Sequence, residues 1–144
     1  MEKIIEMTSL SISEVFEKMF YIFLEPSDDE NDGYDMEAVI GFEGPVRGEI
    51  RMLISRNIVK KMVLNMLNLK EDEVTRHNIE DCSKEAVNMV AGNLFGKLDG
   101  SEKFHLSIPT FKAECSGLSS GKDTCRMDFD SDSGNVGVAV TLSE

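Results

Sequence analysis

The segment from Thr75 to about Leu98 places the strongest constraint on the fold of this 144-residue chain. At about 100° per residue, a helix over this segment would separate its side chains into a mainly apolar and a polar side. Thr75 can cap the first turn of that helix. The mainly apolar stripe contains Ile79, Ser83, Val87, Val90, Ala91, Leu94 and Leu98. A helix with one apolar side has to lie against a second layer, so the segment predicts a layered domain.

The polar side of this predicted helix carries Asp81, Glu85 and Asn88, which lie within about 60° of one another. The acid can bind a cation, and the amide can donate one hydrogen bond while it accepts another from a water. No histidine neighbours Glu85 in the sequence, and no serine or cysteine is evidently activated as a nucleophile. The pair is therefore better suited to positioning a water than to covalent catalysis. The alternative is an ordinary solvated helix face, since this spacing is common by chance.

The remaining segments indicate the class of fold. Residues 10–24 have the period of an amphipathic helix, on which Ile12, Val15, Phe16, Met19, Ile22 and Phe23 share a face. The acidic run 25–37 predicts a solvated loop. We expect strands at 36–43 and 46–54, a helix from Ser55 to about Leu67, an extended segment at 103–115, and a hairpin of 124–130 with 135–142. This order predicts a single domain over residues 1–144, of α/β class (α+β type), with a mainly antiparallel sheet covered by helices in two layers.

Composition narrows the class of function. The chain has 27 acidic and 15 basic residues and a formal net charge of -12, which argues against nucleic-acid or membrane binding. The amino-terminal residues include acids and no long apolar run, so we expect neither a signal peptide nor a membrane span. Cys82, Cys115 and Cys125 are odd in number and lack metal-ligand spacing. Reduced thiols, a cytoplasmic location and no metal bound by this chain are the expectation.

The run Asp81-Cys-Ser-Lys-Glu85-Ala-Val-Asn88-Met-Val-Ala-Gly-Asn93 resembles the active-site helix of the CheX/CheC/FliY phosphatases of bacterial chemotaxis. Residues 10–24 resemble the first helix of that family, residues 40–55 its first glycine-punctuated hairpin, and residues 106–110 its Ser-x-Pro-Thr step. The single site and the order of segments look most like CheX. The resemblance covers about residues 10–142, and it implies a CheC-like fold and a homodimer.

The resemblance also implies a function. Such proteins accelerate the hydrolysis of the aspartyl phosphate on a phosphorylated CheY-like response regulator, which supplies its own Mg²⁺. Glu85 corresponds to the acid that pairs with the regulator's active-site lysine, and Asn88 to the amide that orients the attacking water. Asp81 matches the leading position of the motif, in a supporting role, and exposed Met89 and Gly92 would suit docking. The alternative is a non-catalytic module that binds a regulator or receptor through the same helix.

A second, degenerate copy of the motif is visible near the amino terminus. CheC-type relatives carry two acid–amide sites, and Ser13-x-x-x-Glu17-x-x-Phe20 has the matching spacing. Phe20 stands where the amide belongs, and an aromatic ring cannot hold a water by two directed hydrogen bonds. We therefore predict one site in each chain.

Overall fold

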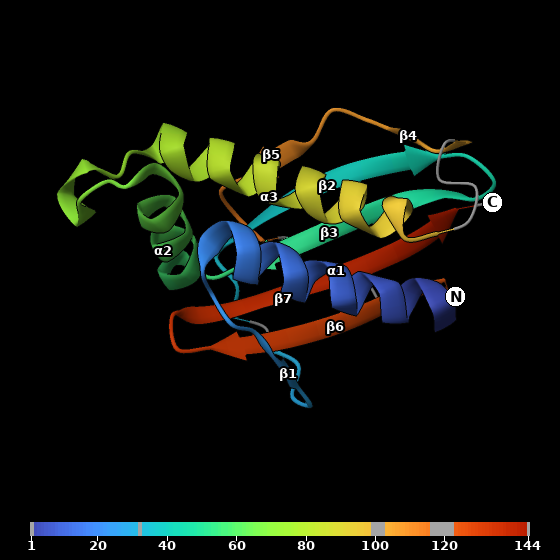
Figure 1. Ribbon diagram of the computed structural model, residues 1–144, viewed down its shortest axis with the longest axis horizontal. Helices are drawn as coiled ribbons and strands as arrows, with labels where there is room; N and C mark the ends of the chain where they lie inside the picture. The colour runs from blue at the N-terminus through green and yellow to red at the C-terminus, as the bar shows by residue number, and fades with distance from the viewer. Residues whose placement is uncertain (1, 32, 99–102, 116–122, 144) are drawn as a thin grey trace.

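Helices cover one face of a sheet in the structure, a computed structural model that describes residues 2–31, 33–98, 103–115 and 123–143 (Figure 1). The elements are α1 (Glu2–Phe20), β1 (Glu25–Ser27), β2 (Met36–Glu43), β3 (Arg47–Ile54), α2 (Arg56–Leu67), a 3-10 turn (Glu71–Glu73), α3 (Arg76–Gly96), β4 (His105–Leu106), β5 (Thr110–Lys112), β6 (Thr124–Ser131) and β7 (Gly134–Ser143). None of the helices within these ranges has the length and apolar character that a membrane span needs.

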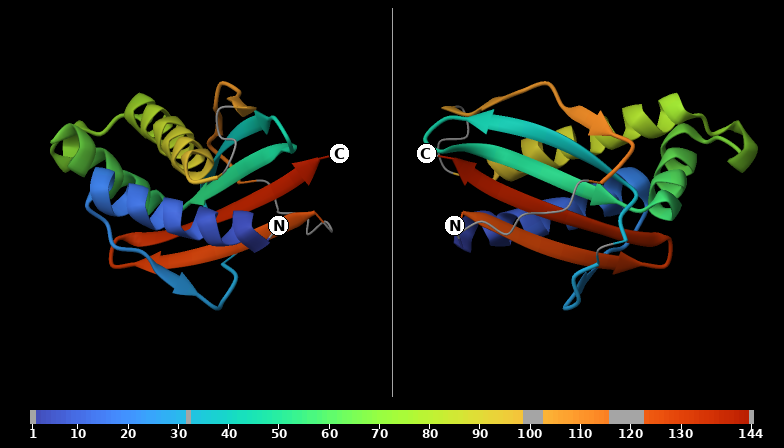
Figure 2. Two further views of the ribbon diagram at one scale, coloured as in Figure 1. Left: turned by 45° about the vertical axis from the view of Figure 1, so that its right-hand side comes forward. Right: turned by 180° about the vertical axis from the view of Figure 1, so that it is seen from behind.

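The strands of the described residues form one antiparallel sheet in the order β1-β6-β7-β3-β2-β4, and β5 also pairs with β2. Two turned views show α1 and α3 side by side across the strands, with α2 near one end of the sheet (Figure 2). This arrangement confirms the predicted two-layer α+β fold with a mainly antiparallel sheet.

The core lies between the sheet and the helices because alternate strand residues point to the helical side. The buried strand residues on that side are Met36, Ala38, Ile40, Phe42, Ile50, Met52, Ile54, Phe129, Val136, Val138 and Val140. Across from them, α3 buries Ser83, Val87, Val90, Ala91 and Leu94 of its predicted stripe, whereas Ile79 and Leu98 at the stripe's ends are only partly buried. The stripe is therefore the side by which α3 is held on the sheet.

The boundaries predicted for the first helix are wrong at both ends. The helix spans Glu2–Phe20 instead of residues 10–24, and Ile4 and Met7 in its added turns pack against the core. Tyr21 ends it by adopting a left-handed conformation with φ of 56°. As a result, Ile22 is buried outside the helix while Phe23 is 72% exposed, so these two do not share a helical face.

The acidic run 25–37 is also not the continuous loop that its composition predicts. Residues Glu25–Ser27 form β1, which pairs with Asp128–Asp130 of β6, and the run ends inside β2. A proline is tolerated in such an edge strand because only one side of the strand needs to pair. The pairing partner lies about a hundred residues further along the chain, so a local pattern does not reveal it.

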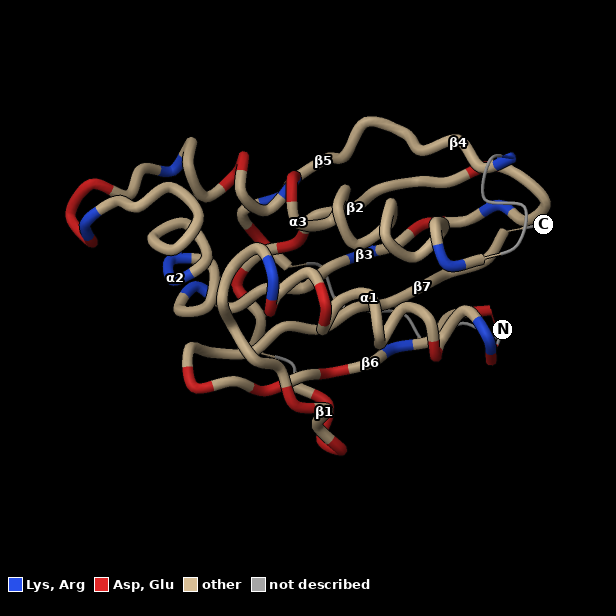
Figure 3. The backbone as a smooth tube through the Cα atoms, in the orientation of Figure 1, with Lys and Arg blue, Asp and Glu red and all other residues tan. Residues whose placement is uncertain are grey.

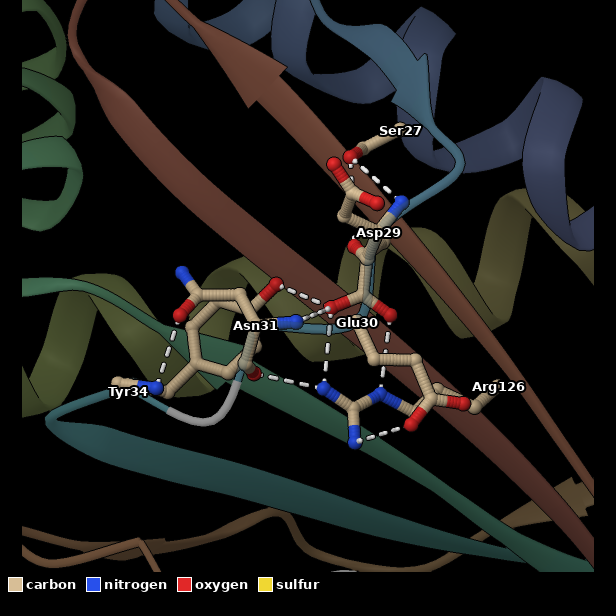
Figure 4. A network of polar contacts seen from close by, with 8 residues as sticks. Ser27, Asp29, Glu30, Asn31, Tyr34 and Arg126 are labelled. Carbon is tan, nitrogen blue, oxygen red and sulfur yellow. Dashed lines mark hydrogen bonds and ion pairs between the residues drawn. The ribbon is translucent and has the colours of Figure 1, made fainter.

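A polar network fixes the next part of this run on the sheet face that the helices leave open (Figure 4). The Asp128 carboxylate accepts hydrogen bonds from Tyr34 Oη at 2.8 Å, from Arg126 Nε at 2.9 Å and from the backbone N–H of Asn31 at 3.1 Å. Burial alone would raise the pKa of Asp128, but the hydrogen bonds from Arg126, Asn31 and Tyr34 together lower it. The network therefore holds the chain before β2 in place through a charged carboxylate.

We expect Asp128→Asn to lower the free energy of unfolding by about 1.5–3 kcal/mol at pH 7, because hydrogen bonds to a charged group are lost. The pKa of Asp128 is lowered by folding, so its stabilisation is present above the unfolded value of about 4 and disappears as the pH falls through the folded value. Urea unfolding at pH 7 and pH 3 should show a difference between variant and wild type that shrinks at pH 3. Equal midpoints at pH 7 would contradict this role.

Candidate functional site

Helix α3 presents Asp81, Glu85 and Asn88 on the side that faces away from the core. Thr75 caps the helix: its hydroxyl accepts from Asn78 N at 3.1 Å, and the Asn78 side chain accepts from Thr75 N at 3.0 Å. Asp81 and Glu85 are exposed and Asn88 is partly exposed, whereas Ala86 and Val87 between them are buried. Acidic positions recur along this first half of α3 (Figure 3).

These three side chains share one open cleft of about 480 Å³. Its other wall is the connector between β4 and β5, which runs alongside the helix. The lining residues are Asp81, Lys84, Glu85, Asn88, Ser107, Ile108 and Pro109. The acid and the amide can therefore act on one group that enters the cleft from solvent.

Met89 and Gly92 lie elsewhere, in a groove of about 400 Å³ between α1 and α3. Asn88 borders this groove as well as the cleft. Met89 is partly buried and packs against the core, which corrects the prediction that it is exposed. Gly92 is exposed, and a Cβ there would have no other atom within 4 Å. The structure thus brings Asp81, Glu85 and Asn88 together in the cleft, whereas Met89 and Gly92 line an adjoining groove that shares only Asn88 with it.

An ion-pair bridge joins the two helices beside this groove. The Glu14 carboxylate of α1 lies 2.7 Å from Lys18 Nζ and 2.9 Å from Lys97 Nζ at the end of α3. Hydrogen bonds from Lys18 and Lys97 lower the pKa of Glu14 to about 2. The carboxylate therefore stays charged, and the bridge stays intact, at any pH near neutrality.

Two further groups on α3 bear on the chemistry of the site. Cys82 is a free, buried thiol whose pKa is raised to about 12, by burial first and then by the charge of Glu85. It therefore stays protonated and is not a nucleophile at neutral pH.

His77, Glu80 and Asp81 bring potential metal-ligand atoms within 4.8 Å of one another, and His77 Nε2 contacts Asp81 Oδ2 at 3.0 Å. Asp81 and His77 are well exposed, so such a site would be open to water.

The degenerate motif on α1 presents no equivalent of this pair. Glu17 is exposed, but Phe20 is fully buried and packs against Phe16 with ring centroids 5.3 Å apart. A partner that contacts Glu17 would not reach the Phe20 ring. Of the two motifs, both within the described residues, only the one on α3 therefore presents an acid and an amide to solvent.

The connector residues Ser107, Ile108 and Pro109, together with Lys84, were not among the site residues predicted from the sequence. Lys84 lies 3.6 Å from Glu80 in an i,i+4 ion pair, a spacing that the sequence already shows. The connector is different, because its place beside α3 depends on the pairing of β4 and β5 with β2. Two signals marked this segment in the sequence: Pro109, because proline interrupts strand pairing, and the resemblance of residues 106–110 to the family's Ser-x-Pro-Thr step.

The helices and the antiparallel sheet form a CheC-like fold. A CheC-like superfamily protein from Shewanella sp. PV-4 is 20% identical, with a TM-score of 0.82 over 99% of this chain and 98% of that one. The family model for the chemotaxis phosphatase CheX matches residues 36–127, and the chain belongs to this family. That range includes α3 and the connector.

Two solved CheX structures show the same fold at similarly low identity. CheX from Vibrio vulnificus is 20% identical, with a TM-score of 0.83 over 97% of this chain and 96% of that one. CheX from Borrelia burgdorferi, solved in a complex with CheY, BeF3 and Mg²⁺, is 19% identical, with a TM-score of 0.78 over 97% of both chains. A comparison with curated proteins found no match.

Proposed function

We propose that this chain accelerates the hydrolysis of the aspartyl phosphate on a CheY-like response regulator. The observation that carries the proposal is the shared cleft, in which Glu85 and Asn88 lie one helical turn apart, open to solvent, on the helix that the family model includes. The CheY bound to the similar Borrelia burgdorferi protein supports a receiver domain as the partner.

In the proposed reaction, Asn88 enters the regulator's phosphorylation site and orients a water. The water oxygen attacks phosphorus, the bond from phosphorus to the aspartyl oxygen breaks, and the electron pair returns to the aspartate carboxylate. Inorganic phosphate leaves, and the proton of the water goes to phosphate or solvent. Orientation of a water is a large share of what a protein can contribute to phosphoryl transfer when charge neutralisation comes from elsewhere.

Glu85 acts on the partner's positive charge in this proposal. It is exposed and one turn before Asn88, so its carboxylate can pair with the regulator's active-site lysine while the amide reaches the phosphate. Asp81 adds a second negative charge at the same cleft in a supporting role. Mg²⁺ is expected in the regulator, where it neutralises the phosphoryl oxygens, and not on this chain.

The proposal is tested by phosphorylating receiver domains from the same genome with acetyl phosphate and following phosphate loss with and without this protein. At least one CheY-like receiver should lose phosphate faster, with a rate that saturates as the receiver concentration rises. A receiver that binds this protein yet keeps its own phosphate lifetime would favour the non-catalytic binding module.

A further inference from the structure

The connector between β4 and β5 contains one more residue than the strand beside it can pair. Leu106 pairs with Phe42 and Thr110 pairs with Val39, so the three residues 107–109 lie opposite the two residues 40–41. Such a surplus forms a β-bulge, which redirects a side chain away from the regular ladder. Pro109 also has no N–H with which to continue that ladder.

Ser107 fixes the base of this bulge on β2. Its backbone N–H donates to Gly41 O at 2.9 Å, and its hydroxyl accepts from Gly41 N at 2.8 Å. The serine hydroxyl thus takes the place of the backbone carbonyl that would pair with Gly41 in a regular ladder. A Cβ on Gly41 would lie only 3.3 Å from Ser107 Oγ, so a glycine suits this close approach. These two hydrogen bonds therefore fix the backbone position of Ser107, the residue before Ile108.

Ile108 is the residue that the bulge turns outward. It is 87% exposed, more than any other large apolar side chain of the described residues, and it borders the cleft with Glu85 and Asn88. A single exposed apolar residue is unremarkable on its own. Its place on a fixed bulge at the edge of this cleft is the informative observation.

We propose that Ile108 is a docking residue, covered by an apolar part of the receiver domain when the phosphoaspartate reaches Asn88. This inference rests on the proposed function. A protein that inserts its phosphorylation site between Glu85 and Asn88 has to pass over the cleft edge, whereas a small phosphorylated molecule would leave Ile108 in water. Burial of this aliphatic side chain adds a contribution to the binding affinity that does not depend on charge, in addition to the charged contact made by Glu85.

The test compares Ile108→Ser with wild type on the receiver whose phosphate loss the protein accelerates. The receiver concentration at half-maximal rate should rise about 10-fold, as expected from the loss of a buried aliphatic side chain, and the maximal rate should stay within about twofold. Ile108→Leu should restore most of the affinity. Val46→Ser, at a 38% exposed aliphatic residue in the β2–β3 turn and outside the cleft, is the matched control and should change neither value.

Three outcomes separate this inference from the proposed function. If Ile108→Ser leaves the half-maximal concentration unchanged while the wild type still accelerates phosphate loss, the docking role is overturned and the proposed function stands. A fall in the maximal rate alone also overturns docking. If the wild type binds the BeF3-loaded receiver without accelerating phosphate loss, the proposed function fails, and the affinity of Ile108→Ser for that same receiver still decides the docking role.

Discussion

Asn88→Ala should abolish most of the accelerated phosphate loss while the protein stays folded. Removing one group that orients a water and meets developing charge typically costs about 10²-fold or more in rate, roughly 2.7 kcal/mol of barrier. Asn88 is partly exposed on the outer side of α3, so the free energy of unfolding should change by less than about 0.5 kcal/mol. Phosphate release at saturating receiver, together with urea unfolding, measures both effects.

The matched control for this change is Asn57→Ala, which removes an exposed amide from α2 outside the cleft. It should leave the rate of phosphate loss unchanged. If Asn88→Ala had the wild-type rate on a receiver that the wild type dephosphorylates, Asn88 would have no part in orienting the water.

Glu85→Gln should weaken the complex and also slow the reaction. The substitution keeps the shape of the side chain and removes its charge, so a charged contact with the receiver's lysine would be lost. Such a loss at a partly desolvated interface costs about 2 kcal/mol or more, roughly 30-fold in affinity. The maximal rate should fall as well, because the lysine is held less firmly for the attack. Affinity for the BeF3-loaded receiver and phosphate loss, each measured at two ionic strengths, report these effects.

The dependence of the affinity on ionic strength shows whether Glu85 acts through its charge. A charged contact is screened by salt, so the affinity of the Glu85→Gln variant should depend less on ionic strength than that of the wild type. Glu17→Gln is the control, since Glu17 is an exposed acid whose one-turn neighbour, Phe20, is buried. In a binding module, Glu85→Gln would weaken docking while the phosphate lifetime stayed that of the receiver alone. No change in either quantity would leave Glu85 as an ordinary solvated charge.

Segments governed by their own period were predictable from the sequence. Ser55 was expected to start the second helix, and it caps α2 at Arg56–Leu67. The hairpin expected at 124–130 and 135–142 is β6 and β7, longer by one residue at most at each end. In these elements the local pattern and the tertiary environment favour the same conformation, so the pattern alone was sufficient.

Features that depend on distant partners were not predictable. The end of α1 depends on the left-handed Tyr21, which no glycine marks, and β1 exists because it pairs with β6. The same limit applies to the candidate site. The outward stripe of Asp81, Glu85 and Asn88 follows from helical period. The opposite wall of the cleft includes Ser107, whose position depends on a hydrogen bond with Gly41, 66 residues earlier in the chain.

The two outermost strands of the sheet also bear on how the protein behaves at high concentration. Among the described strands, the sheet ends at one side in β1, which has three residues including Pro26, and at the other in β4, which has two and is separated from β5 by the bulge at Pro109. Exposed strands that are long and flat recruit strands from other molecules, and proline and bulges prevent this. Interrupted edges of this kind offer little template for open-ended fibril growth, and the strong negative charge of the chain adds mutual repulsion between copies. The bulge that presents Ile108 therefore also helps to keep the protein from aggregating.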